Sequence, residues 1–532
     1  ADDAGLSDNS LAGVARWQAV QDATLAELRA ISPDGLSPTA RRTRRFLIDL
    51  LDAAVGKRVC RDELWAVSPT YTGWQAGFAY LASIQPVATA ADRQAALARF
   101  GALPGWIDEE VENLRRGLEL GYTAPRINVE RVIEQMDSLT AGPPADSPFY
   151  SPAERAGNDP DFARRMGDTI EEGIDPAIRH YREFLANEYL PRAREEIAVT
   201  ANPGGEDCYR ASVRYHTSVE MGPQAIHRLG LDQMAKIAAQ MQRIGAQSFG
   251  TGDVRELLEL VTTDPRYTFD SRQEMVDYAE AAVRRAEQAV PRWFGLVPDA
   301  EVVVVPYPEF RERSAPGAEY SSASDDGSRP GTFYINTYEP ESQSKAGIEA
   351  TAFHETYPGH HLQGSIAKQF ATGHPVQRYF GTSGFSEGWG LYSERLAEEM
   401  GIYSGDVDLL GLLSNEALRA ARLVVDSGMH GLGWSRQQAI DYVLAHTAEP
   451  PTRAAAEVDR YIAVPGQATA YMIGNLEIRR LRDLAERELG EGFDVGEFHD
   501  RVLEDGAVTL PMLADKIQSW ISDEKAAGAP GG

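Results

Sequence analysis

The stretch of sequence that decides how this chain is interpreted is residues 354–361, HETYPGHH. It holds three of the ten histidines of the chain and one glutamate, Glu355. Neutral imidazole is the commonest zinc ligand in proteins, and a glutamate beside it can act as a general base. The stretch therefore predicts a metal site of the zincin kind, in which HExxH places two histidines on one helical face.

The stretch departs from HExxH because Pro358 stands where the second histidine is expected. In a regular helix, His354 and His360 would be separated by about 600° and would point in different directions. Pro358 lacks an N–H and crowds the carbonyl one turn before it, and Gly359 permits unusual backbone angles. We therefore expect a bulge at the Pro-Gly step that brings His360 beside His354, with His361 as the alternative second ligand.

A third ligand is expected on a later helix, because a catalytic zinc usually has three protein ligands and one open position. Glu387 lies 27 residues after His360, and the small residues around it would let another helix approach closely. Glu394 follows seven residues later, on the same face of the predicted helix. We expect Glu387 to bind the metal and Glu394 to orient a metal-bound histidine.

These motifs resemble those of the bacterial family called domain of unknown function 885. The resemblance extends from about residue 10 to residue 522, and it rests on HETYPGHHLQ (354–363), SEGWGLYSE (386–394), DSGMH (426–430) and RYIAVPGQ (460–467). It implies a zincin-like, peptidase-like metalloenzyme. In that family the first and last members of HExxPGH recur, whereas Tyr can stand at the position of His361, which favours His354 and His360 as the ligands.

A group besides the metal is needed to stabilise the oxyanion of a hydrolytic reaction. We expect it in the C-terminal blocks, where Tyr471 and His430 are the leading candidates and Arg460 and Tyr461 are further ones. Asp426 lies four residues before His430 on a predicted helix and would support the site from behind.

Substrate binding is expected at a strand that comes just before the metal motif. In zincins an edge strand pairs with an extended substrate, so residues 332–337 are predicted to do so. Tyr320, Arg329 and Tyr334 would line this cleft together with Tyr461, and Arg329 would hold a substrate carboxylate.

The rest of the chain predicts a mainly α fold of the zincin-like metallopeptidase kind, with a small sheet inserted before the metal-binding helix. Residues 301–305 and 332–337 are rich in β-branched and aromatic residues and predict strands, whereas 314–331 is rich in Ser, Gly, Asp and Pro and predicts a loop. The expected regions are an N-terminal helical region (1–200), a helical region lining the cleft (201–300), a catalytic region (301–522) and a flexible tail (523–532).

The composition indicates which binding partners and which cellular compartment to expect. The 532 residues carry a formal charge of −28, which argues against nucleic acid and anionic membrane surfaces as partners. Cys60 and Cys208 lie far apart and form no CxxC, so we expect two free, buried thiols in a reducing compartment. No apolar run of membrane-spanning length and no signal peptide is visible, so a cytoplasmic location is expected, with secretion after removal of a signal as the alternative.

These patterns favour a hydrolase that holds one divalent ion, zinc by preference, although Mn or Co could occupy the same ligands. The expected substrate is a peptide or a small amide. Two alternatives stay open: a metal-dependent amidohydrolase or lyase that acts on a small specialised metabolite, and a non-catalytic helical binding protein. The sequence does not indicate the oligomeric state.

Overall fold

The computed structural model describes residues 3–308, 312, 317–325, 327 and 329–528. The chain is mainly helical with one small sheet, as predicted. The first half contains α1 (Leu11–Ala30), α2 (Pro38–Lys57), α3 (Trp74–Ile84), α4 (Ala90–Leu120), α5 (Arg126–Leu139), α6 (Ser151–Arg155), α7 (Pro160–Thr169), α8 (Asp175–Phe184), α9 (Gly205–Thr217), α10 (Pro223–Ile244), α11 (Val254–Thr263) and α12 (Arg272–Ala289).

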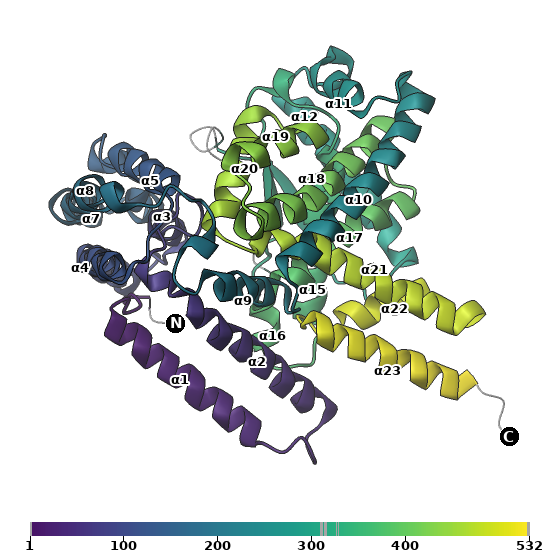
Figure 1. The fold of residues 1–532 in the computed structure, drawn as a ribbon, viewed down its shortest axis with the longest axis horizontal. Coiled ribbons are helices and arrows are strands. Elements are labelled where there is room, and N and C mark those ends of the chain that lie inside the picture. The colour runs from purple at the N-terminus through teal and green to yellow at the C-terminus, as the bar shows by residue number, and fades with distance from the viewer. Residues whose placement is uncertain (1–2, 309–311, 313–316, 326, 328, 529–532) are drawn as a thin grey trace.

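The second half carries the predicted metal motif and the C-terminal blocks. Its helices are α14 (Ile348–Glu355), α15 (His360–Gln369), α16 (Val376–Tyr379), α17 (Ser383–Glu399), α18 (Asp406–Gly431), α19 (Arg436–His446), α20 (Pro451–Ala463), α21 (Ala470–Leu489), α22 (Val495–Leu503) and α23 (Leu510–Gly528). Figure 1 shows α3, α4, α5, α7 and α8 gathered on one side of the molecule, and α17, α18 and α21 in the body on the other side.

The helices that surround the metal motif have ends and faces that the sequence explains. Helix α17 begins after Thr382, whose side chain accepts a hydrogen bond from the N–H of Phe385. Helix α18 is buried along most of its length, because it runs through the middle of the body. Trp389 of α17 is fully buried, and its Nε1–H donates to the carbonyl of Pro358 at 3.0 Å. The loop of the metal motif is thereby fixed to α17.

The sheet lies directly before the metal motif, and its strand order is β1-β3-β2. Its strands are β1 (Val302–Pro306), β2 (Ala318–Ser321) and β3 (Gly331–Ile335). Strand β1 pairs with β3 in parallel, and β2 pairs with β3 antiparallel, with Tyr320 opposite Phe333. The two predicted strands are present, but β2 was expected to be part of a loop.

This topology corrects the expectation that residues 332–337 form an edge strand for the substrate. Strand β3 is central, and both of its edges are already paired, so it has no free edge to offer. The outer edge nearest the metal motif belongs to β2, which carries Tyr320. Periodicity could not identify β2, because it has only four residues and all of them are half-buried.

The two cysteines are joined, which corrects the expectation of two free thiols. Cys60 and Cys208 form a disulfide with a Cα–Cα distance of 4.6 Å. Cys60 ends a short 3-10 helix after α2, and Cys208 lies in the first half of α9. Their separation of 148 residues concealed the pairing, since contacts between distant helices leave no local signal in the sequence.

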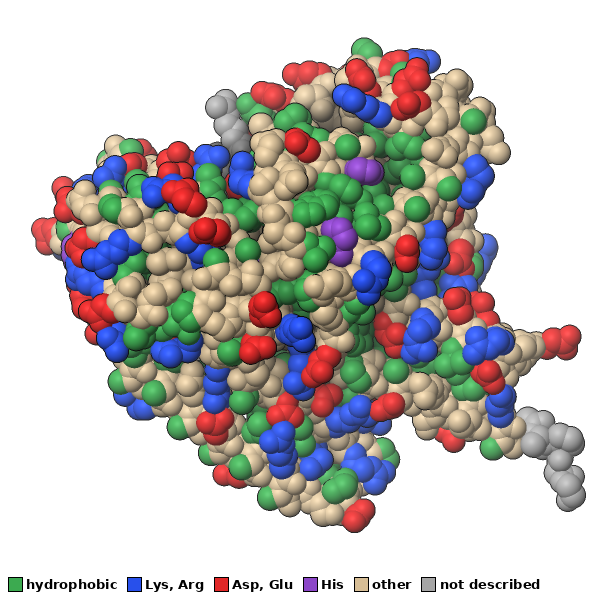
Figure 2. Space-filling model, in the orientation of Figure 1, with side chains coloured by type: hydrophobic (Ala, Val, Ile, Leu, Met, Phe, Trp, Pro, Cys, Tyr) green, Lys and Arg blue, Asp and Glu red, His purple; other side chains and the backbone are tan. Residues whose placement is uncertain are grey.

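The last helix extends into the predicted tail. Residues 523–528 were expected to be a flexible tail, but they continue α23 as far as Gly528, and residues 529–532 lie outside the described part of the chain. Within the described ranges, no helix combines the length and apolar character that crossing a bilayer requires. Figure 2 shows acidic and basic side chains intermingled on one face of the molecule, so the net negative charge is not concentrated there.

Candidate metal centre

The metal motif is divided between two helices. Helix α14 ends at Glu355, and α15 begins at His360, so the distortion is a complete helix break and not the expected bulge. Gly359 is required at the break, because a Cβ atom there would lie 1.9 Å from the carbonyl oxygen of His354. The break lets the two histidines approach each other at a spacing that a continuous helix would not allow.

The structure brings His354, His360 and Glu387 together. The Nε2 atoms of His354 and His360 lie 3.4 Å and 3.5 Å from Oε2 of Glu387. The two imidazole rings are nearly perpendicular, at 87°, with centroids 4.7 Å apart. One donor atom from each residue lies within 4.8 Å of the other two. The predicted ligand set is therefore a cluster in space, and His361 is not part of it.

Small residues on α17 make room for this cluster. A Cβ atom at Gly390 would lie 2.5 Å from Nε2 of His354, so the imidazole occupies the space that a side chain would fill. Gly388 and Gly474 bring the backbones of α17 and α21 into contact, because a Cβ atom at Gly388 would lie 2.5 Å from Gly474. This close packing sets the position of Glu387, which directly precedes Gly388.

A second carboxylate orients the first histidine. The Nδ1–H of His354 donates to Oε1 of Glu394 at 2.8 Å, and both side chains are buried. Nε2 of His354 is therefore the nitrogen left to face Glu387 and His360. Arg419 lies 3.8 Å from the same oxygen of Glu394. This is the arrangement by which carboxylates hold metal-binding histidines in one orientation.

The positive charge of the histidines and the negative charge of Glu387 stabilise each other. Burial alone would lower the pKa of His354, but the hydrogen bonds that its ring donates to Glu387 and Glu394 raise it to about 9. Burial alone would raise the pKa of Glu387, but both histidines hold it well below its usual range. Two imidazole nitrogens and one carboxylate oxygen that converge in this way fit the ligands of a catalytic zinc of the His₂Glu kind.

Glu355 lies beside the cluster. It is the last residue of α14 and half-buried, and its carboxylate has no hydrogen-bond or ion-pair partner among the described residues. Its charge raises the pKa of both His354 and Tyr320, after larger contributions from other groups. Glu355 therefore lies near both the ligand cluster and Tyr320 of strand β2, with its carboxylate available.

His361 supports Tyr320 and does not face the other histidines. Its Nε2–H donates to the carbonyl of Ala300 at 3.0 Å, so Nδ1 is the acceptor for the hydroxyl of Tyr320 at 2.8 Å. Burial lowers the pKa of His361 to about 4, which keeps the ring neutral. Gly331 of β3 leaves space for this pair, since a Cβ atom there would lie 2.6 Å from Nδ1 of His361.

Tyr471 lies on the other side of the cluster, near Glu387. It is the second residue of α21, one turn before Gly474, and the guanidinium of Arg422 lies 4.5 Å from its ring centroid. Burial raises the pKa of its hydroxyl, and the charge of Glu387 adds to that rise. Tyr471 therefore lies near the cluster, and its role as an oxyanion donor stays a prediction.

Sequence reasoning missed Tyr71, which reaches the site from the N-terminal helices. The residue is 58% exposed; partial burial of the hydroxyl raises its pKa, the charge of Arg460 opposes that rise, and the charge of Glu387 adds to it. Tyr71 stands in a loop before α3, about 300 residues from the metal motif, and no motif marks it. Only the folded chain shows that it lies at the site.

Three predicted residues have structural roles. Both ring nitrogens of His430 bind backbone groups: Nδ1 accepts from the N–H of Val199, and Nε2–H donates to the carbonyl of Tyr461, each at 3.0 Å. Asp426 accepts hydrogen bonds from the hydroxyl of Tyr209 and the N–H of Gly466. His430, Asp426 and Tyr461 are all fully buried, so the structure does not support a catalytic, supporting or substrate-binding role for them.

Two further predicted residues are directed away from the cluster. Arg329 binds Oγ of Ser321 and the carbonyl of Ser322 within its own loop, and it is exposed. The ring of Tyr334 stacks on Tyr307 with centroids 5.6 Å apart. Because side chains alternate along a strand, Tyr334 lies on the face of β3 opposite to Gly331 and His361. Neither residue is placed to bind the substrate as expected.

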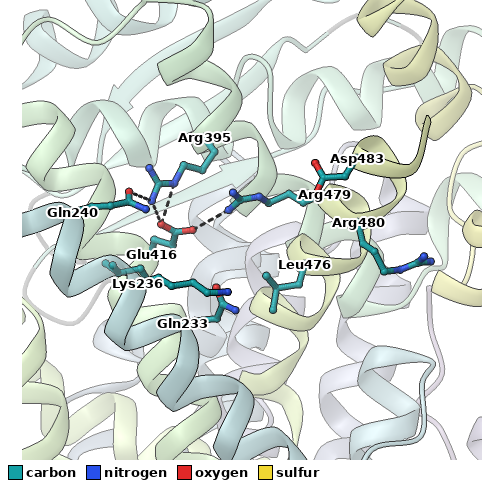
Figure 3. A pocket seen from close by; sticks show the side chains of 10 residues that line it. Gln233, Lys236, Gln240, Arg395, Glu416, Leu476, Arg479, Arg480 and Asp483 are labelled. Carbon is teal, nitrogen blue, oxygen red and sulfur yellow. Dashed lines mark hydrogen bonds and ion pairs between the residues drawn. The ribbon is translucent and has the colours of Figure 1, made fainter. Parts of the chain in front are cut away.

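A surface pocket with a volume of about 260 Å³ lies elsewhere on the body, between α10, α17, α18 and α21. Figure 3 shows Arg395 and Arg479 directed toward Glu416, which is buried and binds both of them. None of the predicted site residues lines this pocket. The pocket is therefore separate from the ligand cluster. Its arginines are already paired with carboxylates.

The fold and the site define a class: a mainly helical protein in which two histidines and a glutamate from three helices converge at a helix break. The comparison with known families agrees with the resemblance that the motifs carry. The chain belongs to the family described as bacterial protein of unknown function (DUF885), whose model matches residues 1–517. No curated protein matches the chain in sequence.

Two solved structures are similar over nearly the whole chain. One is a "putative lipoprotein" from Colwellia psychrerythraea, at 27% identity and a TM-score of 0.91, with 97% of this chain and 92% of that chain covered. The other is a "putative lipoprotein" of unknown function from Shewanella oneidensis, at 18% identity and a TM-score of 0.76, with 97% and 94% covered. The second likeness concerns the fold alone.

The first of these relatives corrects the expected location. A protein named as a putative lipoprotein points to a membrane-anchored or secreted protein, so the expectation of a cytoplasmic one is wrong. The disulfide between Cys60 and Cys208 agrees with this correction, because disulfides persist in oxidising compartments.

Proposed function

We propose that this protein is a zinc-dependent hydrolase of peptide or amide bonds. The observation that carries the proposal is the convergence of His354, His360 and Glu387, with Nε2 of both histidines within 3.5 Å of one carboxylate oxygen. These residues would hold the metal, and Glu394 would keep His354 in its ligating orientation. A zinc ion bound there lowers the pKa of a water molecule and polarises a carbonyl.

Glu355 would act as the general base. Its half-buried carboxylate has no partner among the described residues, so it is available to accept a proton from the attacking water. The water oxygen then bonds to the carbonyl carbon, the C–N bond breaks, and Glu355 passes the proton to the leaving amine. The position of Glu355, directly after His354 at the end of α14, fixes the base beside the metal ligands.

Two tyrosines flank the cluster and would position the substrate. Tyr471 stands near Glu387 on α21, and its hydroxyl could donate to the developing oxyanion. Tyr320 stands on the edge strand β2 near Glu355, and the outer edge of β2 could pair with an extended peptide. The substrate would thus lie between β2 and the start of α21.

The experiment that tests this proposal compares three proteins purified without added metal. The wild type should contain about one equivalent of zinc and should hydrolyse members of a panel of short peptides and small amides. Glu355→Gln should retain the zinc and lose about 10²- to 10⁴-fold in rate. Glu341→Gln, a matched change at an exposed glutamate, should match the wild type in both measurements.

The metal content and the activity are independent readouts. Well under one equivalent of bound metal in the wild type would contradict the zinc site. Full activity in Glu355→Gln would contradict the assignment of the base. Hydrolysis of small amides but not of peptides would keep the reaction and change the substrate class.

A further inference from the structure

A pair of buried arginines lies beside the proposed metal site. Arg422 of α18 and Arg460 of α20 both bind the same oxygen, Oε2 of Glu457, at 2.9 Å. Arg422 is 7% exposed, and the side chain of Arg460 is 14% exposed. Tyr461 lies between them, since its hydroxyl donates to Glu457 and accepts from Nε of Arg422.

This pair carries more positive charge than its neighbours neutralise. Two guanidinium groups share one carboxylate, which leaves about one uncompensated positive charge in mostly buried surroundings. Asp426 also lies near Arg460, but burial raises its pKa to about 7, so it does not supply a full charge at neutral pH. Burying an unpaired charge is costly unless a ligand completes it.

The hydrogen-bonding capacity of the pair is also incomplete. A guanidinium has five N–H donors. Nη1 of Arg422 is buried and has no hydrogen-bond partner. Arg460 gives Nη1 to Gln467 and Nη2 to Glu457, and each of these nitrogens has a second hydrogen. The arginine pair therefore has N–H donors left over for a negatively charged hydrogen-bond acceptor.

The arginine pair adjoins the cluster through two tyrosines. The guanidinium of Arg422 stacks on the ring of Tyr471, with its carbon 4.5 Å from the ring centroid, and Tyr471 lies close to Glu387 because α17 and α21 are in backbone contact. The charges of Arg460, Glu387 and Arg422 also affect the pKa of Tyr71, which belongs to the N-terminal region. An anion bound by the arginine pair would thus lie beside Tyr471, next to the metal ligands.

We infer that Arg460, supported by Arg422, binds the free carboxylate of the substrate, so that the protein removes carboxyl-terminal residues or divides dipeptides. Arg460 is the more exposed of the two guanidinium groups, and its planar donors match a carboxylate. The inference rests on the proposed function, because it identifies which peptides the same site accepts. It also replaces Arg329, which the structure directs elsewhere, as the residue for a substrate carboxylate.

Binding can be measured without turnover in zinc-loaded Glu355→Gln protein. Calorimetry would compare a set of N-acetyl dipeptides that differ in their last residue with the same compounds amidated at the carboxyl terminus. The free acids should bind about tenfold or more tightly than the amides, as expected for a charge-assisted bidentate pair. Equal binding of acids and amides, or no binding of either, would overturn the inference without any arginine variant.

Arginine variants then locate the effect. Adding Arg460→Gln should remove the preference for the free acids and leave the weak binding of the amides within about twofold, because only the charged contact is lost. Arg436→Gln is the matched control. Arg436, at the start of α19, forms a similar pair with Asp459 of α20, and this variant should keep the preference for the free acids. A preference that survives Arg460→Gln would overturn the assignment.

The two proposals fail in different ways. If wild-type protein hydrolyses amidated peptides as fast as free acids, the hydrolase proposal stands and the carboxylate inference falls. If the free acids bind more tightly in calorimetry but no peptide or amide is hydrolysed, the anion site stands and the hydrolase proposal falls.

Discussion

Nδ1 of His354 lies 2.8 Å from Oε1 of Glu394, and both side chains are buried. This bond joins α14 to α17, the two helices that also supply His354 and Glu387 to the metal cluster. The carboxylate both fixes the ring and increases the electron density that the opposite nitrogen offers to a metal.

Replacing Glu394 with Gln should therefore weaken metal binding while the fold persists. The amide oxygen can still accept from His354, but the negative charge is lost, so we expect zinc affinity to fall about tenfold. Competition with a chromophoric chelator would measure the change. Glu398→Gln is the control, because Glu398 lies on the same helix in a partly exposed pair with Arg395. An unchanged affinity in Glu394→Gln would contradict the orienting role.

Gly390→Ala should remove the metal by displacing a ligand. The new methyl group would lie 2.5 Å from Nε2 of His354, too close for both atoms to keep their places. Alanine otherwise favours helices by about 1 kcal/mol relative to glycine, so α17 should remain formed. Mass spectrometry of bound zinc and the thermal midpoint would be measured together. Gly364→Ala, at a helical glycine with open space around it, should keep its zinc; a normal zinc content in Gly390→Ala would disprove the steric argument.

Removing the disulfide should lower stability without altering the site. Cys60 and Cys208 close a long loop, and disulfides of this kind contribute about 2–4 kcal/mol. Urea unfolding of Cys60→Ser/Cys208→Ser protein should show that loss, and a reducing agent should destabilise the wild type but not the double variant. Titration of two free thiols in wild-type protein unfolded without reductant would show that the bond does not form.

His430 should affect the acid stability of the fold and leave catalysis unchanged. Burial lowers its pKa from 6.5 to about 4, so the unfolded chain binds a proton more readily than the folded one between these values. The ring therefore contributes stability above pH 6.5 that is lost as the pH falls toward 4, by up to about 1.4 kcal/mol per pH unit.

The test compares the wild type with His430→Gln at pH 7 and pH 5. The free energy of unfolding of the wild type should fall more between these values, because glutamine does not titrate. Activity per folded molecule at pH 7 should be the same in both proteins. A parallel pH dependence, or a loss of activity in the folded variant, would show that His430 has another role.

The ligand cluster is predictable from the sequence because its chemistry is concentrated in short motifs. His354 and His360 lie within one stretch of eight residues, and the proline and glycine between them indicate that the helix cannot continue. Glu387 and Glu394 stand out through their spacing and the small residues beside them. Local rules of this kind do not depend on the rest of the fold.

The residues that sequence reasoning misplaced depend on long-range packing. His430 and Asp426 are four residues apart, in a pattern typical of a functional site. Their side chains are nevertheless already hydrogen-bonded to groups from α9, α20 and the loops around them. Cys60 meets Cys208 across 148 residues, and Tyr71 lies near Arg460 and Glu387, which follow it by more than 300 residues. No periodicity records such contacts, and the short strand β2 leaves too weak a pattern to reveal that β3 is central.

The bond between residues 60 and 208 has a consequence for limited proteolysis of the folded protein. A single cut in an exposed loop anywhere between these positions leaves two fragments that stay covalently attached, with Tyr71 still carried on the tethered piece. Nicked molecules would therefore separate on a denaturing gel only after reduction.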